Sequence, residues 1–260
     1  MACPHRVRRW LFWHRCFLLA GLLFMLFQLH AQALRVAISA DDYPPFYYQQ
    51  GDTLHGFSVE VLQAVATELG LSLQWQRLPW SRVVQHVVSG KADVITVFYK
   101  TDARAEQFYY SSERYLRDPI VLLCARPCQT AFDGNLASLA QQPVAVVRDF
   151  SYGPLLDRLE FSRAAVVDSD PMLFKQLIKQ RLQLGIASLI SVRHAPELKQ
   201  AGDKVQILYP VLDYVDIYFA FSRQSAITPE LVSRFDQVLQ RYKKTEAYTV
   251  LLGRYQLIDL

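Results

Sequence analysis

Apolar and polar positions alternate along the chain in strand and helix patterns, arranged in two successive groups. Residues 34–40 alternate like a strand, whereas residues 58–69 carry Val, Leu and Ala at the spacing of an amphipathic helix that stops at Gly70. The first group is expected to contain, in chain order, strand 34–40, helix 58–69, strand 71–75, a short helix opening at 79 and ending at Gly90, and strand 92–97.

The same order of patterns returns in the second half of the chain. It is expected to contain strand 144–147, a helix near Leu155, strand 164–167, helix 171–181, strand 184–187, a helix around 189–201, strand 214–221, and closing helices at 229–242 and 246–252. Alternating strands and helices predict mostly parallel sheets that are covered on both faces. Because no flexible Gly- and Ser-rich linker separates the groups, we expect an α/β fold of two lobes joined by short crossing strands.

The first 33 residues have the layout of a secretory signal peptide. Four arginines lie within the first 15 residues, an unbroken apolar run covers 17–27, and Ala31-Gln32-Ala33 is a small-residue cleavage site. We therefore expect cleavage after Ala33 and export to the periplasm. A membrane anchor is the alternative, but polar residues from position 28 onwards leave an apolar stretch that is short for a span. The Arg8-Arg9 pair also permits twin-arginine export, which the strongly apolar core disfavours.

The charge balance changes once this leader is removed. Of the 28 Lys and Arg residues, four lie in 1–33, which leaves 24 against the 24 Asp and Glu residues. A formally neutral mature chain gives no reason to expect a nucleic acid or an anionic membrane as partner, because both require clustered Lys and Arg. Its length suits two small lobes better than one simple domain.

Two cysteines remain after cleavage, Cys124 and Cys128. In an oxidising compartment this pair is expected to close a small structural disulfide loop. A redox dithiol is the alternative, although it usually has two intervening residues. Half of a metal site is another, but His55, His86 and His194 are dispersed, so no second cluster would complete a zinc shell. We therefore expect no metal and no cofactor.

Three loops are the first candidates for a binding site. In open α/β sheets, ligands bind outside the carboxyl ends of the strands. That rule selects residues 41–48 after the first strand, 98–104 after the third, and 148–153 after the first strand of the second group. All three loops are rich in aromatic and polar side chains.

Short motifs in these loops, taken together, resemble a known family. They are Tyr43-Pro44-Pro45-Phe46, Gly56-Phe57, Pro79-Trp80, Gly90-Lys91-Ala92-Asp93, Thr101-x-x-Arg104 and Tyr110-Ser111-Ser112. In this order the chain resembles the periplasmic solute-binding proteins of ABC importers, of the polar amino-acid (family 3) type. The resemblance implies a type II two-lobed fold with the ligand cleft between the lobes. We expect lobe 1 to comprise 34–118 and 214–260, and lobe 2 to comprise 119–213.

The resemblance also implies roles for individual residues. Tyr43 would stack on the ligand, and Arg104 would clamp its α-carboxylate with help from the Thr101 hydroxyl; a planar bidentate donor suits that task. The other candidates are Phe46 and Trp80 as cleft walls, Ser151 in the loop that completes the carboxylate cage, and Tyr99 and Tyr152 as further aromatic contacts.

The chain departs from the family pattern at the site for an ammonium group. Spacing from Arg181 places the usual aspartate at Ser188, which carries no charge. Asp149 stands where the family generally has glycine. Asp149, Asp41 or Asp42 would be a substitute partner for the ammonium group. Phe98 and Tyr99 also occupy positions where small hydroxyl residues are common. A more aromatic ligand, or one without a free amine, fits this pattern equally well.

The function implied is capture of a small polar solute, an amino acid or related carboxylate, for an inner-membrane ABC permease. Such receptors are usually monomeric. One alternative is a sensing role, in which the protein docks to a chemoreceptor or sensor kinase. The other is an enzyme, dehydratase-like, on the same scaffold. We expect no enzyme, because the three loops offer aspartates but no His or Glu as a positioned acid or base.

Overall fold

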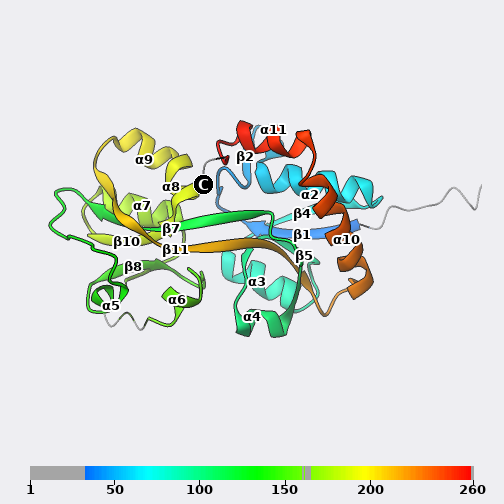
Figure 1. Ribbon diagram of the computed structural model, residues 1–260, viewed down its shortest axis with the longest axis horizontal. Coiled ribbons are helices and arrows are strands. Elements are labelled where there is room, and N and C mark those ends of the chain that lie inside the picture. Colours follow the sequence, from blue (N-terminus) through cyan, green and yellow to red (C-terminus); the bar gives the residue numbers. More distant parts are fainter. Residues whose placement is uncertain (1–32, 160, 162–164, 259–260) are drawn as a thin grey trace, which may run out of the picture. The chain divides into compact units, whose positions relative to one another are not determined.

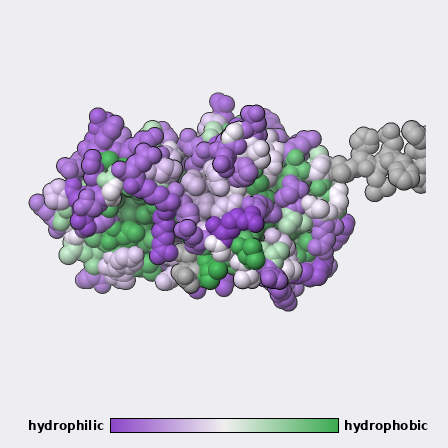
Figure 2. Space-filling model, turned by 90° about the horizontal axis from the view of Figure 1, so that it is seen from above, coloured by the Kyte–Doolittle hydropathy of each residue, from purple (hydrophilic) through white to green (hydrophobic). Residues whose placement is uncertain are grey.

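The computed structural model describes residues 33–159, 161 and 165–258 (Figure 1). The predicted leader lies outside these residues apart from Ala33, and so does Ala164 at the predicted start of a strand. No helix in the described ranges is long and apolar enough to cross a membrane. Figure 2 shows one face that is mainly hydrophilic, with hydrophobic residues exposed in separate areas.

Lobe 1 is built on three parallel strands. In β1 (Ala33–Ser39) each residue pairs with one of β4 (Ser72–Leu78), and β5 (Val94–Tyr99) lies on the other side of β1. Helix α2 (Phe57–Glu68) covers one face of this sheet, and α3 (Trp80–Val88) covers the other (Figure 1). The predicted elements of the first group are therefore present, although β5 extends through Phe98 and Tyr99, which were expected in a loop.

Short elements complete lobe 1. The hairpin β2 (Tyr48–Gln50) and β3 (Thr53–His55) precedes α2, and α4 (Asp102–Gln107) and β6 (Phe108–Tyr110) follow β5. The sequence patterns did not predict these four elements. The closing helices α10 (Pro229–Tyr242) and α11 (Glu246–Arg254) were predicted, and both pack on α2.

Lobe 2 repeats the arrangement on three further parallel strands. These are β8 (Val144–Val147), β9 (Ala165–Val167) and β10 (Leu184–Ser188). Helices α7 (Asp170–Ile178), α8 (Leu189–His194) and α9 (Pro196–Ala201) lie on one side, and the short α5 (Leu136–Leu139) and α6 (Pro154–Asp157) lie on the other (Figure 1).

One predicted helix of lobe 2 is two helices. The pattern favoured a single helix around 189–201, but Ala195 has extended backbone angles, φ −63° and ψ 117°. Pro196 has no backbone N–H, and its ring disfavours a helical conformation in the residue before it. The proline therefore ends α8 and begins α9.

Two long strands join the lobes. β7 (Leu116–Ala125) and β11 (Val205–Ser222) pair antiparallel from Leu116 opposite Ile217 to Ala125 opposite Val205, with a register shift between Leu208 and Asp213. At one end β11 pairs with β5, and at the other β7 pairs with β10. The crossing strands were expected to be short, and only residues 214–221 of β11 were predicted. β7 and β11 are 10 and 18 residues long, and through them the strands of both lobes form one continuous sheet.

An ion pair at the edge of lobe 1 explains part of one sequence motif. Asp93 accepts hydrogen bonds from the backbone N–H of Arg35 at 2.7 Å and from its guanidinium at 2.7 and 2.9 Å. Burial raises the pKa of Asp93, but the hydrogen bonds from Arg35 outweigh it, so this pKa lies below its usual value. The aspartate of Gly90-Lys91-Ala92-Asp93 therefore joins β1 to the start of β5.

The predicted disulfide is present. Cys124 and Cys128 are joined with an S–S distance of 1.94 Å, at the end of β7. The described residues contain no group of three or more side chains arranged to hold a metal ion.

Candidate functional site

A cavity of about 40 Å³ lies where the ends of β1, β5, β8 and β10 meet. It is lined by residues of both lobes: Tyr43, Tyr47, Trp80, Val97, Phe98, Tyr99, Arg104, Phe150, Ser151, Tyr152, Asp170 and Ser188. This position follows the rule for ligand sites in parallel sheets. A volume of this size admits only a few water molecules. A solute as large as an amino acid therefore enters only when the lining side chains or the lobes move apart.

The structure brings together most of the residues that the sequence predicted. The candidates that line the cavity are Tyr43, Trp80, Tyr99, Arg104, Ser151, Tyr152 and Ser188. Phe46, Thr101 and Asp149 were also predicted, but their side chains lie around the cavity rather than in its lining. The cavity also contains Tyr47, Phe150 and Asp170, which were not predicted.

Arg104 is a partly buried cation that forms no ion pair with a carboxylate among the described residues. Its guanidinium donates to the carbonyl of Tyr99 at 3.1 Å and to that of Asp149, in lobe 2, at 3.0 Å. It also lies 4.1 Å above the centre of the Phe98 ring. Among the described residues it forms no ion pair, and burial lowers its pKa. A guanidinium held by neutral carbonyls in a low-dielectric site is suited to bind an anion.

Thr101 acts on Arg104 through the backbone. It is the N-cap of α4, and its Oγ1 accepts a hydrogen bond from the Arg104 N–H at 3.2 Å. The cap fixes the first turn of the helix and hence the direction in which Arg104 leaves it. A direct contact between the Thr101 hydroxyl and a ligand carboxylate stays a prediction.

Asp149 contributes its carbonyl to the cleft. Its φ of 61° is in the left-handed region, where glycine is most at ease, in agreement with the glycine expected there. In this conformation the carbonyl accepts hydrogen bonds from Trp80 Nε1 at 3.3 Å and from Arg104. One backbone oxygen of lobe 2 therefore holds two side chains of lobe 1.

Aromatic rings surround the cavity, and the Phe150 ring contacts three of them. Its ring centre lies 5.2 Å from that of Trp80, 6.4 Å from Tyr152 and 6.5 Å from Tyr43. The rule for strand ends selected the loop 148–153, but Phe150 itself was not predicted, because a phenylalanine carries no polar group that would distinguish it from a core residue. Phe46, predicted as a wall, is fully buried and stacks beneath Tyr43 at 5.1 Å, so it supports the ring that faces the cavity.

The polar groups of the lobe 2 loop are largely committed to the loop itself. The Ser151 hydroxyl donates to Asp157, which also accepts from the backbone N–H of Tyr152 at 2.8 Å. The Tyr152 hydroxyl accepts from the backbone N–H of Val147 at 2.8 Å. These bonds hold the loop at the start of α6. Contact of Ser151 and Tyr152 with a ligand stays a prediction.

Ser188 faces a buried carboxyl group that the sequence did not reveal. Asp118, in β7, accepts hydrogen bonds from Tyr99 Oη at 2.6 Å and from Ser188 Oγ at 2.9 Å. Its side chain is fully buried, and burial raises its pKa to about 7. The serine that stands at the expected ammonium position is therefore a donor to Asp118.

A second buried carboxyl group lies at the start of α7. Asp170 is 3 % exposed, and its Oδ2 accepts a hydrogen bond from Ser191 Oγ at 2.9 Å. Burial raises its pKa to about 6, while hydrogen bonds from Ser191 and Tyr43 act in the opposite direction. Burial and then the charge of Asp170 raise the pKa of Tyr43 well above its usual value. The sequence signal was an acid beside Pro171 at a helix start, which is also an ordinary helix-terminal feature.

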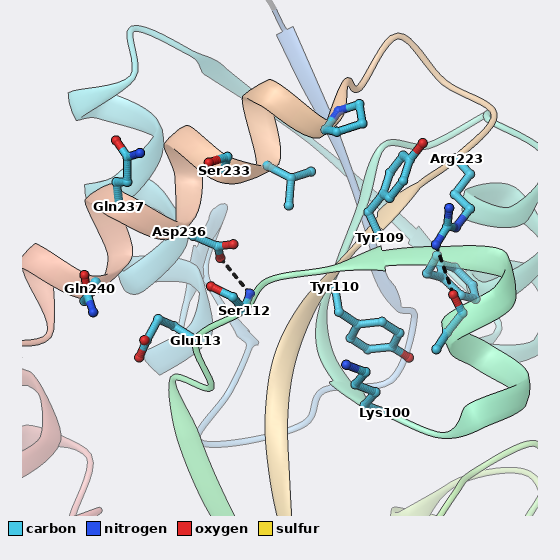
Figure 3. A pocket seen from close by; sticks show the side chains of 14 residues that line it. Lys100, Tyr109, Tyr110, Ser112, Glu113, Arg223, Ser233, Asp236, Gln237 and Gln240 are labelled. Atoms are coloured by element: carbon cyan, nitrogen blue, oxygen red, sulfur yellow. Dashed lines mark hydrogen bonds between the residues drawn. The ribbon is translucent and has the colours of Figure 1, made fainter.

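Other hollows lie outside this cavity. One, of about 630 Å³, is a groove of lobe 1 between α10 and β6, where Asp236 accepts from the Ser112 N–H at 2.9 Å (Figure 3). It contains none of the predicted residues. A second, of about 580 Å³, shares Tyr43 and Asp170 with the cavity and extends between the loop 41–49 and helices α7 to α9.

Two α/β lobes that are joined by two long strands, with a cleft of aromatic rings and an arginine, define the type II periplasmic solute-binding fold. The chain belongs to the bacterial extracellular solute-binding proteins, family 3, whose family model matches residues 34–257. The predicted fold class and the resemblance to this family are therefore confirmed.

Known proteins of this kind resemble the chain to different extents. It is 34% identical over 79 residues to the probable amino-acid-binding protein YxeM of Bacillus subtilis (strain 168), and the match covers 30% of each protein. The chain thus matches less than a third of that curated relative. An ancestral arginine-binding protein bound to arginine has a TM-score of 0.73 at 18% identity, over 86% of this chain and 97% of that one. A histidine kinase sensor domain has a TM-score of 0.75 at 19% identity, over 86% and 96%. These two likenesses show the fold.

Proposed function

We propose that the protein is an extracytoplasmic receptor that captures a small polar solute, an amino acid or a related carboxylate, and delivers it to an inner-membrane ABC permease. The proposed form is a periplasmic monomer whose leader is cleaved after Ala33. Membership of a family of extracellular solute-binding proteins supports this function. The observation that carries it is the partly buried guanidinium of Arg104, which lines the cavity and is held by two backbone carbonyls rather than by a carboxylate.

The proposed binding step follows from the contacts of Arg104. A carboxylate is a stronger acceptor for a guanidinium than a carbonyl, because both partners are charged. The solute carboxylate would replace the Asp149 carbonyl on Arg104 and would lie between Tyr43, Trp80 and Phe150. Lobe movement about the crossing strands would admit the solute and then enclose it, which is the hinge closure known for such receptors.

A second candidate function is solute sensing in partnership with a chemoreceptor or a sensor kinase. The likeness to a histidine kinase sensor domain favours it, because the same fold serves in that protein. Both functions use the same binding step, so they differ only in the membrane partner. Neighbouring permease and ATPase genes would support transport, whereas a neighbouring sensor gene would support sensing. We propose no catalytic role for the site.

The test is a thermal-shift screen of the exported protein against standard amino acids, related carboxylates, amines and small peptides. A ligand at a hundred times its dissociation constant should raise the free energy of unfolding by about 2.7 kcal/mol. Arg104→Ala should weaken binding of a carboxylate ligand by about 30-fold or more, because the ligand carboxylate, enclosed in the closed cleft, loses its charged partner. Titration calorimetry measures this change.

Arg148→Ala is the matched control for this test. Arg148 lies in the neighbouring loop, is 58 % exposed and pairs with the exposed Asp168 at 3.1 Å, so its loss should leave affinity within about twofold. Unchanged affinity in Arg104→Ala would remove the assigned site. Absence of any stabilising carboxylate would contradict the receptor function itself.

A further inference from the structure

One oxygen of a buried carboxyl group beside the cavity has no hydrogen-bond partner. Asp170 Oδ2 accepts from Ser191, but Oδ1, which is shielded from solvent, makes no hydrogen bond of normal geometry in the described chain, although the Tyr43 hydroxyl lies near the carboxyl group. Buried polar atoms are almost always satisfied, because an unpaired one keeps its full desolvation penalty. The unpaired oxygen therefore marks a place where a donor is expected from outside the chain.

Asp170 is placed where a solute can reach it. It borders the 40 Å³ cavity that contains Arg104, and it also borders the 580 Å³ hollow beside the loop 41–49. As the first residue of the nine-residue helix α7, it lies at the positive end of the helix dipole, which favours its ionised form. It is thus an anionic group at the junction of two spaces.

The other carboxyl groups near the cleft either already accept hydrogen bonds, form an ion pair, or are exposed to solvent. Asp118 accepts from Tyr99 and Ser188 and has no orphaned oxygen. Asp149 offers its carbonyl to the cleft and is exposed. Asp42 pairs with Arg77 at 2.7 Å. Asp170 is the one carboxyl group in the lining of the small cavity in the described chain, and its Oδ1 is free to accept a hydrogen bond from a ligand.

We propose that Asp170 binds the cationic group of the solute, so that the ligand is a zwitterion with an ammonium or a guanidinium in addition to its carboxylate. This inference rests on the proposed receptor function, in which Arg104 binds the carboxylate. The cavity lining then provides one partly buried cation, Arg104, and one buried anion, Asp170, which match the two charges of such a molecule. In the family pattern the cation is bound at the end of β10, where this chain has Ser188. Here the proposed cation site lies at the start of α7, the helix that precedes β10 in the chain.

The larger hollow gives room for the remainder of the molecule. Its ionisable residues are Asp41, Asp42, Tyr43, Tyr48, Asp170, Lys175, His194 and Glu197. Lys175 lies 3.9 Å from Glu197, and Asp42 pairs with Arg77, which leaves Asp41 without an ion pair in the described chain. A second positive charge on a longer side chain would therefore find Asp41 beyond Asp170.

The experiment compares matched compounds on the full chain, expressed with its leader and purified after export. Each L-amino acid is paired with the carboxylate of the same skeleton that lacks the amine, and calorimetry gives both affinities. In the wild type the amino acid should bind at least tenfold more tightly. Asp170→Asn should weaken its binding by about 30-fold or more and leave the amine-free compound within about threefold. Asp168→Asn, whose parent carboxyl is 69 % exposed and pairs with Arg148, should change neither affinity.

Each other outcome has a distinct meaning. If carboxylates bind the wild type equally well with and without an amine, or if Asp170→Asn weakens both compounds alike, the cation site is refuted while the receptor function stands. If no compound of either class binds, the receptor function fails and the cation site fails with it. Should Asp170→Asn not fold, Asp170→Ser, which keeps a hydroxyl at the helix start, gives the same comparison.

Discussion

At the scale of single residues, Ser188 stands where the family pattern has an aspartate, and under the proposed cation site Asp170 would supply the missing charge. Ser188 replaces a charge by a hydroxyl, and that hydroxyl is used to satisfy Asp118. A carboxylate at position 188 would face Asp118 at a distance where two negative charges repel strongly. The presence of Asp118 thus accounts for a neutral residue at the strand end. With a neutral residue at the strand end, the carboxyl group that lines the cavity is that of Asp170, at the start of α7.

The two buried aspartates predict an unusual dependence of stability on pH. Burial raises the pKa of Asp118 to about 7 and that of Asp170 to about 6, from 3.8 for both in the unfolded chain. Between these values the folded protein binds more protons than the unfolded chain, so the free energy of unfolding falls as pH rises. Lowering the pH from 7 to 5 should therefore stabilise the ligand-free protein, by about 3 kcal/mol from these two groups. Urea denaturation at both pH values measures it.

Asp118→Asn is the control for this prediction, because it removes the larger contribution and should flatten the profile. The ionisable groups that face Asp170 across the two spaces are Asp41, Asp42, Tyr43, Tyr47, Tyr48, Tyr99, Arg104, Tyr152, Lys175, His194 and Glu197, with Asp118 behind them. Stability that falls steadily from pH 7 to 5 would contradict the assignment. Affinity for a cationic solute should change in the opposite sense, because protonation of Asp170 removes its charge.

At the scale of elements, the turn that carries Tyr43 depends on a glycine. Gly56 precedes α2 with a φ of 133°, and a Cβ there would lie 2.3 Å from the carbonyl oxygen of Phe46. The backbone of residues 45–46 also accepts hydrogen bonds from the first N–H groups of α2, from Phe57 at 2.7 Å and Ser58 at 3.0 Å. The helix start and the Tyr43 loop are therefore packed backbone against backbone.

Gly56→Ala should consequently lower the free energy of unfolding by about 3 kcal/mol or more, since both strain and a clash arise. Thermal denaturation of the variant gives the value. Gly51→Ala is the matched control, because its φ is 59° but no atom lies within 4 Å of the added Cβ, so only about 1 kcal/mol should be lost. Equal effects of the two substitutions would show that the contact with Phe46 is unimportant.

Elements were predictable from the sequence where one face is exposed and the apolar spacing is clear. Helix α10 has the predicted bounds, and α2 begins one residue earlier than expected. β7 was missed because it is buried over almost its whole length, which removes the alternation, and Pro119 interrupts the pattern. Half of β11 was missed because Tyr209-Pro210 resembles a loop.

The candidate site was predictable where it follows strand ends. Tyr43 and Arg104 lie in loops that the rule for parallel strands selected, whereas Trp80 was predicted only through the resemblance to the family, which also implied the roles of all three. Asp118 could not be found, because it lies inside a strand that the pattern did not show. Asp170 was overlooked because an acid at a helix start is a common stabilising feature. Only the fold reveals that this particular acid is buried and incompletely bonded.

At the scale of the whole molecule, one backbone oxygen joins two side chains of the opposite lobe in this cleft. The Asp149 carbonyl accepts from Trp80 and from Arg104, and Phe150 beside it packs on the indole ring. If a solute takes Arg104 from this carbonyl, the surroundings of the indole change at the same time. Solute binding and lobe closure would therefore both change the contacts of the Trp80 indole.

This arrangement gives the protein a built-in optical signal. The proposed mature chain, cleaved after Ala33, has only two tryptophans, Trp75 and Trp80, so in it Trp75→Phe would leave a single emitter at the cleft. Saturation with a carboxylate solute should shift the emission wavelength or intensity of that variant, and Trp80→Phe should abolish the response while Trp75 remains. A response that survives in Trp80→Phe would place the change elsewhere. If the signal behaves as expected, the chain needs no attached dye to act as a sensor of its own cargo.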